Sequence, residues 1–125
     1  MVESPFKGKT GLRRIWNAFH YSLAGLAAAI KHEDAFRQEV LLAAILIPLA
    51  FYLDVGPFER AVMLFAVFLI LIVELLNSAV EAAVDRISLE NHLLAKRAKD
   101  IGSAAVLITL VNLAVIWGCI LLPKL

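Results

Sequence analysis

The chain has 125 residues, of which 62% are apolar and only 18% are charged, and its mean hydropathy is +0.84. A domain this short has too much surface to bury so many apolar side chains in water, so the composition excludes an ordinary soluble domain, a disordered chain and a multidomain enzyme. Twelve basic and eleven acidic residues give a net charge of +1, which provides no reason to expect a nucleic-acid partner. The single cysteine, Cys119, excludes an internal disulfide.

The first predicted element is an amphipathic helix over residues 12–32, which follows a polar tail at residues 1–11. Its apolar side chains recur mostly at steps of three and four residues, the spacing of one helical face. They are Leu12, Ile15, Trp16, Phe19, Leu23, Leu26 and Ile30. The opposite face is basic and polar, and a helix of this kind binds membrane surfaces. We therefore expect a surface helix, with a helix that binds a soluble partner as the alternative.

Three apolar segments follow, at residues 36–53, 61–84 and 101–122, and each is long enough to cross the hydrocarbon core of a bilayer. The sequence therefore predicts an all-α membrane protein with one N-terminal surface helix and three transmembrane helices, in a single membrane-embedded domain over residues 1–125. In the third segment, Thr109 and Asn112 need hydrogen-bond partners in lipid, which favours an oligomer.

The first transmembrane segment is the shortest, and it reaches eighteen residues only when it is counted from Phe36. This length requires Arg37 and Glu39 to extend towards the lipid headgroups. Pro48 lies inside the segment, and neighbouring helices can accommodate a proline in a transmembrane helix. A turn marked by Gly56 and Pro57 separates this segment from the next one.

Basic residues are distributed unevenly between the two sides of the predicted membrane helices. Ten of the twelve precede the apolar core of the first segment or lie between the second and the third: Lys7, Lys9, Arg13, Arg14, Lys31, Arg37, Arg86, Lys96, Arg97 and Lys99. Only Arg60 and Lys124 lie on the other side. The positive-inside rule therefore predicts a cytoplasmic N-terminus and a C-terminus on the outer side.

A polar stripe follows the second transmembrane segment and consists of Glu74, Asn77, Ser78, Glu81 and Asp85. At about 100° per residue, these five side chains fall within an arc of about 100°. A carboxylate at membrane depth costs about 3 kcal/mol, and Glu74 follows thirteen apolar residues, so an early end of the helix does not explain it. One such carboxylate can hold a hard cation such as Mg²⁺ and another can act as a general base. We therefore interpret the stripe as a functional site.

Four motifs in the same order resemble the small bacterial integral-membrane diacylglycerol kinases, and the resemblance covers residues 12–122. The motifs are Tyr21-Ser22 with Gly25-Leu26, the string Glu-Asp-Ala-Phe-Arg-Gln-Glu at 33–39, the stripe at 74–86 and the segment 98–106. The resemblance implies a homotrimer in the bacterial inner membrane, with a periplasmic C-terminus. It also implies transfer of the γ-phosphate of ATP to diacylglycerol with Mg²⁺, which gives phosphatidic acid for phospholipid recycling.

The same resemblance implies roles for individual residues. Glu74 is the implied general base, Glu33 and Glu81 are the implied metal ligands, and Asn77 orients the reacting groups. The implied ATP-binding residues are Tyr21, Glu33, Asn77, Glu81, Glu90, His92, Lys99 and Asp100. The implied lipid-binding residues are Arg14, Ser22, Arg37, Glu74 and Ser103.

Three other interpretations remain open at this stage. The undecaprenol kinases share the Glu-Asn-Glu stripe, although they usually read Lys-Asp-Val-Ala-Ala-Gly-Ala where this chain reads Lys-Asp-Ile-Gly-Ser-Ala-Ala at 99–105. A proton-coupled transporter subunit would explain a buried carboxylate, since acids within the membrane also serve ion pathways. A purely structural membrane protein would use the acids only to pair with basic residues between protomers.

Overall fold

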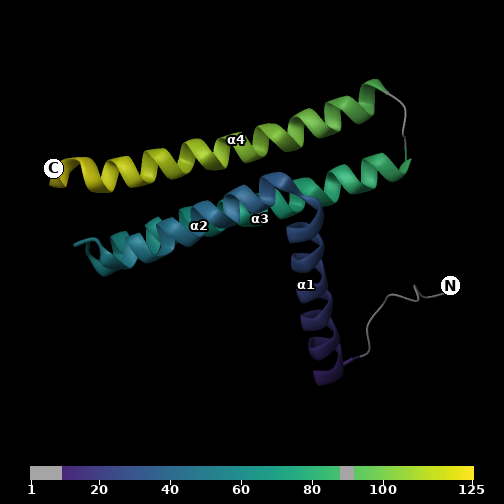
Figure 1. Cartoon of the computed structure of the whole chain (residues 1–125), viewed down its shortest axis with the longest axis horizontal. Helices are drawn as coiled ribbons and strands as arrows, with labels where there is room; N and C mark the ends of the chain where they lie inside the picture. The colour runs from purple at the N-terminus through teal and green to yellow at the C-terminus, as the bar shows by residue number, and fades with distance from the viewer. Residues whose placement is uncertain (1–9, 88–91) are drawn as a thin grey trace. The chain divides into compact units, whose positions relative to one another are not determined.

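The computed structural model describes residues 10–87 and 92–125, and every element in this part of the chain is a helix. The elements are α1 (Leu12–His32), α2 (Asp34–Tyr52), α3 (Pro57–Ile87), α4 (Leu93–Leu121) and a short 3-10 helix, η1 (Leu122–Lys124) (Figure 1). The chain divides into two compact units, which meet in sequence at Glu33 and Asp34. The prediction of an all-α protein is confirmed for the described residues, and residues 1–9 of the predicted tail lie outside them.

Helix α1 covers the residues predicted for the surface helix, and its apolar face is exposed along its whole length. Trp16 is 62% exposed and Phe19 is 56% exposed, which water alone does not favour. The helix begins after Gly11, whose φ of 75° suits a residue without a side chain. Lys31 and His32 occupy its last turn, where positive charge interacts favourably with the helix dipole.

Helices α2, α3 and α4 are each long and apolar enough to cross a membrane. Helix α3 extends beyond the predicted span of 61–84 at both ends, and α4 begins before the predicted span of 101–122, because the charged segments at these ends continue the helices. Pro57 is the first residue of α3, where its fixed φ and its missing N–H suit a helix start. Pro48 lies within α2, and the helix continues to Tyr52.

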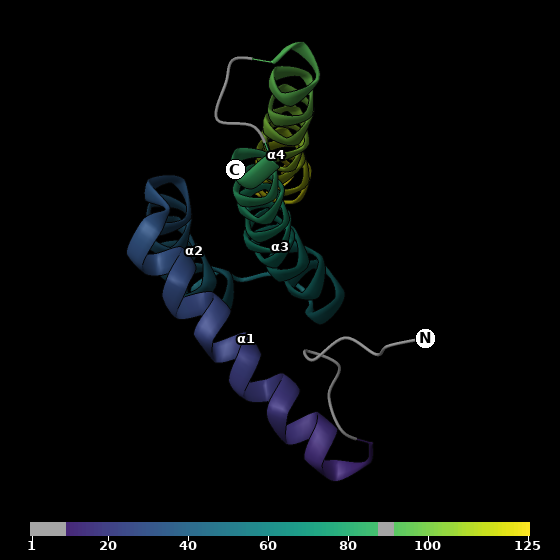
Figure 2. The ribbon, with the colours of Figure 1, turned by 90° about the vertical axis from the view of Figure 1, so that its right-hand side faces the viewer.

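Helix α3 is the central element of the second unit and lies between α2 and α4 (Figure 2). A cluster of buried residues joins the three helices at the end where α3 begins: Ala43, Ala50, Val55, Met63, Val67 and Trp117. The indole nitrogen of Trp117 donates a hydrogen bond of 3.2 Å to the backbone carbonyl of Met63. This bond joins the C-terminal part of α4 to the N-terminal part of α3, as the antiparallel arrangement requires.

Two polar residues, Thr109 and Asn112, lie in the apolar part of α4. Thr109 is 5% exposed, and its hydroxyl donates to the carbonyl of Val106 at 2.6 Å. Thr109 therefore finds its hydrogen-bond partner within its own helix, because a threonine hydroxyl can donate back to the preceding turn. Asn112 is half-buried on the same helix.

The turn between α2 and α3 is closed by two charged side chains. The Nε of Arg60 donates to the carbonyl of Ala50 at 3.0 Å, and a terminal nitrogen of the same side chain donates to the carbonyl of Leu53 at 3.2 Å. These carbonyls lie at the C-terminal end of α2, where the helix supplies no donor of its own. Glu59 accepts a bond of 3.0 Å from the N–H of Gly56, which caps the start of α3.

We expect Arg60→Met to destabilise the chain, because two helix-end carbonyls lose their donor. Hydrogen bonds from a charged group contribute about 1.5–3 kcal/mol. Thermal unfolding in detergent micelles, followed by circular dichroism, measures the loss. Arg86→Met, at the exposed far end of the same helix, is the matched control and should change stability by less than about 0.5 kcal/mol. Equal losses in the two variants would contradict the role assigned to Arg60.

Candidate functional site

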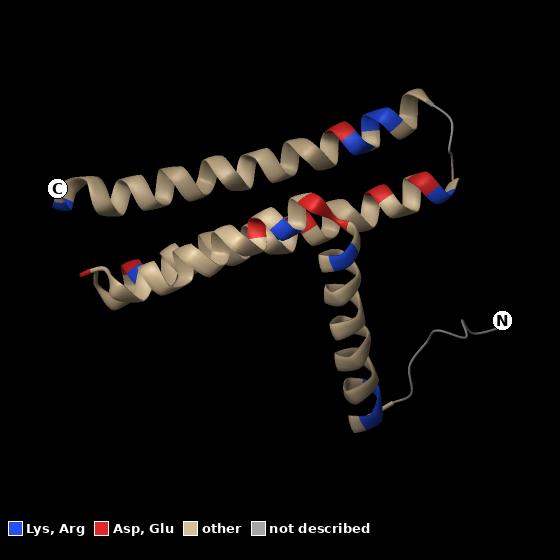
Figure 3. Ribbon diagram, viewed as in Figure 1, with Lys and Arg blue, Asp and Glu red and all other residues tan. Residues whose placement is uncertain are grey.

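The polar stripe of α3 begins in the buried part of the helix and ends at its exposed tip. Glu74 is 4% exposed and Ser78 is 8% exposed, whereas Asn77 and Glu81 are half-buried and Asp85 is exposed. Charged residues of α3 and α4 gather at the end where α3 finishes and α4 begins (Figure 3). The stripe therefore leads from a carboxylate surrounded by protein to a charged surface.

Residues four positions apart orient one another along this stripe. The amide nitrogen of Asn77 donates to Oε1 of Glu81 at 3.4 Å, and the hydroxyl of Ser78 donates to Oε1 of Glu74 at 3.4 Å. Both distances are long for hydrogen bonds, so these contacts orient the carboxylates without holding them tightly. The second oxygen of Glu81 can therefore bind a further group.

Helix α4 supplies a cation to the exposed end of the stripe. The Nζ of Lys99 lies 2.5 Å from Oδ1 of Asp85, and Glu81 also attracts this ammonium group. The two side chains are 41% and 54% exposed, so the ion pair contributes little to stability and its partners can exchange. The structure thus brings Lys99 to the stripe, as the predicted site requires.

Glu39 of α2 lies in the interior of the second unit, close to Glu74 of the polar stripe. It is 9% exposed, its Oε2 has no hydrogen-bond partner, and it lies close enough to Glu74 for the two carboxylates to repel each other. The expectation that Glu39 extends to the headgroups is therefore wrong. The buried Phe36, Ala43 and Ala50 share its face of α2, and this spacing was the signal for an inward side chain.

Arg37 differs from Glu39 because its side chain is exposed and pairs with Asp34 in the first turn of α2. Ser103, another predicted lipid-binding residue of the second unit, is exposed on α4.

Two predicted nucleotide-binding residues of α4 have local partners instead. His92 precedes the helix, and its Nδ1 accepts a hydrogen bond of 3.1 Å from the N–H of Leu94, which makes it an N-terminal cap. Asp100 pairs with the Nζ of Lys96 at 2.7 Å. Glu90 lies outside the described residues.

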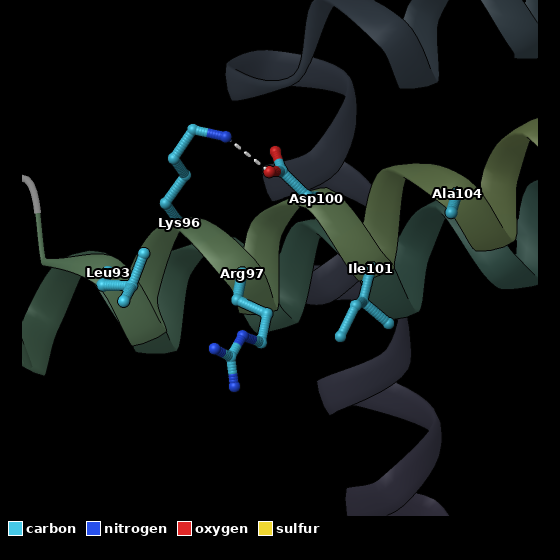
Figure 4. A pocket seen from close by; sticks show the side chains of 6 residues that line it. All are labelled: Leu93, Lys96, Arg97, Asp100, Ile101 and Ala104. Atoms are coloured by element: carbon cyan, nitrogen blue, oxygen red, sulfur yellow. Dashed lines mark hydrogen bonds and ion pairs between the residues drawn. The ribbon is translucent and has the colours of Figure 1, made fainter.

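The Lys96–Asp100 pair borders an open groove of about 370 Å³ on α4. Its lining residues are Leu93, Lys96, Arg97, Asp100, Ile101 and Ala104, and the pair points to one side while Arg97 points to the other (Figure 4). Asp100 is displaced by about 100° around the helix from Lys99. The structure therefore does not bring Asp100 to the polar stripe.

The remaining predicted site residues belong to the first unit. Arg14 and Tyr21 are exposed on α1, and the hydroxyl of Ser22 donates to the carbonyl of Ala18 at 2.9 Å. Glu33 ends the helix, and its backbone N–H donates to the carbonyl of Ala29 at 2.9 Å. The two proposed metal ligands, Glu33 and Glu81, therefore lie in different units.

Within residues 10–87 and 92–125, no group of three or more His, Cys, Asp and Glu side chains is arranged to hold a metal ion. Magnesium does not require such a group, because it is usually bound by one or two carboxylates together with water and substrate phosphates. Glu81 offers a carboxylate of this kind. This hard oxygen donor fits Mg²⁺ as a cation whose remaining ligands are water and phosphate oxygens.

The fold and the site together define a class, an all-helical membrane protein with a polar site built between its helices. The profile of the prokaryotic diacylglycerol kinase family matches residues 20–121. The chain is 61% identical over 122 residues to the diacylglycerol kinase of Pseudomonas aeruginosa, which covers 98% of this chain and 99% of that protein. It is 52% identical over 112 residues to the diacylglycerol kinase of Haemophilus influenzae, with 90% and 95% covered. The diacylglycerol kinase of Escherichia coli (strain K12) is 50% identical over 113 residues, with 90% and 92% covered.

The chain therefore belongs to the prokaryotic diacylglycerol kinase family, and the resemblance seen in its four motifs is confirmed. Membership in a family of kinases favours an enzyme over a transporter subunit or a purely structural protein.

The buried carboxylates lead to a prediction about stability. We expect Glu39→Gln to raise the thermal midpoint, because a neutral amide of the same shape removes the repulsion between Glu39 and Glu74. Glu74→Gln should also raise the thermal midpoint. The free energy of unfolding gained by the double variant should be smaller than the sum of the two single gains by about 0.5–3 kcal/mol. Thermal unfolding of the wild-type chain, the two single variants and the double variant in micelles measures these gains. Strictly additive gains would contradict the proximity of the two carboxylates.

Proposed function

We propose that this chain transfers the γ-phosphate of ATP to the free hydroxyl of diacylglycerol, which gives phosphatidic acid. Family membership supports the lipid acceptor, and the relatives named diacylglycerol kinase cover nearly the whole chain. The observation that carries the chemical assignment is Glu74, which is 4% exposed and yet continuous with a charged surface through Asn77 and Glu81. A lipid hydroxyl can reach such a carboxylate from within the membrane, while phosphates approach from the charged end.

Glu74 is the proposed general base for the reaction. Its carboxylate accepts the proton of the diacylglycerol hydroxyl as that oxygen bonds to the γ-phosphorus and the bond from this phosphorus to ADP breaks. The hydroxyl of Ser78 orients one oxygen of Glu74 during this step. Phosphoryl transfer depends mainly on positioning and charge neutralisation, and a positioned general base contributes a factor of about 10²–10⁴ to the rate.

The charged end of the stripe is the proposed site for the triphosphate. Lys99 can exchange its exposed partner Asp85 for phosphate oxygens, because surface ion pairs of this kind are weak. Glu81, together with Glu33 of the first unit, is proposed to hold Mg²⁺, which when bound would neutralise the charge of the transferring phosphate. We place Tyr21, Glu90, His92 and Asp100 around the nucleotide by family resemblance alone.

The protein is proposed to lie in the bacterial inner membrane with its N-terminus in the cytoplasm and its C-terminus in the periplasm. Ten of twelve basic residues support this orientation under the positive-inside rule. It places the charged end of α3 and α4 at the inner leaflet, where ATP is available. The exposed apolar face of α1 supports a position at the membrane surface, next to the lipid substrate.

Comparison of lipid acceptors tests the proposed reaction directly. We expect the purified chain in mixed micelles to phosphorylate dioleoylglycerol in preference to undecaprenol, as measured by transfer of radiolabelled phosphate from ATP. Glu74→Gln should lower the rate with dioleoylglycerol by about 10²-fold or more. Glu59→Gln, on the same helix, is the matched control, because glutamine can also accept the bond from Gly56. Preference for undecaprenol would overturn the acceptor, and a wild-type rate in Glu74→Gln would overturn the base.

Magnesium titrations test the metal assignment. We expect Glu81→Gln and Glu33→Gln each to raise the Mg²⁺ concentration required for the half-maximal rate, because each variant loses a hard oxygen ligand. The apparent KM for diacylglycerol should change much less. Asp85→Asn, one turn further along α3, is the control for the loss of a negative charge near the site. Unchanged titrations in both glutamate variants would reject the metal site.

We further propose a homotrimer in which one site draws residues from two chains. The half-buried Asn112 and the exposed apolar faces of the membrane helices support self-association. Mixed trimers of Glu74→Gln and Glu33→Gln chains should recover activity, because Glu33 belongs to the first unit and Glu74 to the second. Glu74→Gln mixed with Glu81→Gln should not recover it, since one α3 helix carries both residues. Equal failure of both mixtures would argue against a shared site.

A further inference from the structure

Gly102 of α4 lies directly against the side chain of Asn77 on α3. A Cβ atom added at Gly102 would overlap Oδ1 of Asn77 and would lie 3.2 Å from its Cγ. The other helical glycines of the described residues leave room for a methyl group. A Cβ at Gly118 meets only Leu122 at 3.8 Å, and one at Gly25 meets nothing within 4 Å.

Gly102 lies inside α4, where glycine is an unfavourable residue. A glycine inside a helix costs about 1 kcal/mol relative to alanine, so helix formation alone disfavours it. Gly102 shares one face of α4 with Val106 and the buried Thr109, at steps of four and three residues. The glycine therefore lies where α4 faces α3, and an alanine would improve the helix only by displacing Asn77.

The hydrogen bond to Glu81 and the contact with Gly102 fix the orientation of the Asn77 amide. A carboxylate accepts hydrogen bonds and does not donate them, so the nitrogen of the amide must face Oε1 of Glu81. Oδ1 consequently faces Gly102, where it is buried and has no hydrogen-bond partner. A buried carbonyl oxygen without a donor is unfavourable. Close approach of the α4 backbone limits the space into which this amide could turn.

We propose that Gly102 is a positioning residue: its missing side chain admits the amide of Asn77 between α3 and α4 in the one orientation that directs a hydrogen bond to Glu81. Glu81 is thereby turned so that its second oxygen remains available to a cation or phosphate group. The effect on metal binding rests on the proposed function of Glu81, whereas the coupling between Gly102 and Asn77 does not.

The test compares Gly102→Ala with Gly118→Ala, which adds the same methyl group to the same helix. We expect Gly102→Ala to raise the Mg²⁺ concentration for the half-maximal rate and to lower kcat by about tenfold or more, the usual cost of losing a hydrogen bond to a charged group. The KM for diacylglycerol should change little. Gly118→Ala should retain wild-type kinetics, and identical behaviour of the two variants would overturn the proposal.

A second pair of variants separates positioning from general packing. Asn77→Ala leaves space for the added methyl group, so in that background Gly102→Ala should not change the Mg²⁺ requirement further. It should no longer lower the thermal midpoint and should raise it slightly, because alanine forms a helix better than glycine does. An equal, additive loss in both backgrounds would overturn the proposal. If Gly102→Ala alone does not fold, recovery of folding in the double variant supports the coupling, and no recovery overturns it.

The wild-type chain, Gly102→Ala, Asn77→Ala and the double variant together distinguish the failure of this proposal from the failure of the proposed function. If the wild-type chain phosphorylates no lipid, the proposed function fails, and the thermal midpoints still report on Gly102 and Asn77. A coupling between the two substitutions then supports the placement of the amide, and its absence overturns that placement.

Discussion

A carboxylate within a membrane requires polar groups from its own protein, because lipid offers it neither water nor hydrogen-bond donors. Glu74 creates this requirement in the middle of α3, and the arrangement of the second unit meets it. α3 is the central helix, its polar stripe lies against its neighbours, and Ser78 and Asn77 orient the two carboxylates nearest to them. The apolar faces of the helices remain on the outside.

The periodicity of the sequence was sufficient to predict the helices and the polar stripe. A 3.6-residue repeat fixes which side chains share a face, and Glu74, Asn77 and Glu81 are on the face that it indicates. Helix ends follow less directly from apolar composition, since charged residues flanking the apolar segments continue α3 and α4. Apolar composition marks where lipid is, whereas hydrogen bonding decides where a helix stops.

Two residues near the site are hard to recognise in the sequence, because their roles depend on tertiary contacts. Glu39 lies between an exposed Arg37 and an apolar run, and only the spacing of Phe36, Ala43 and Ala50 indicates that it points inward. Gly102 is an ordinary small residue in the sequence. Its importance follows from how closely α4 approaches the Asn77 side chain, which is a property of two helices packed together. His92 has a structural role that the family resemblance does not indicate, because this predicted nucleotide-binding residue also caps the start of α4.

The two tryptophans of the chain divide between its two units. Trp16 is 62% exposed on α1, whereas Trp117 is 9% exposed and hydrogen-bonded to the backbone of α3. Their intrinsic fluorescence therefore reports on two different environments without any added label. Emission from Trp117 follows the contact between α3 and α4, and emission from Trp16 follows the polarity around α1. Replacing either tryptophan by phenylalanine would leave a chain that carries one native optical probe for one unit.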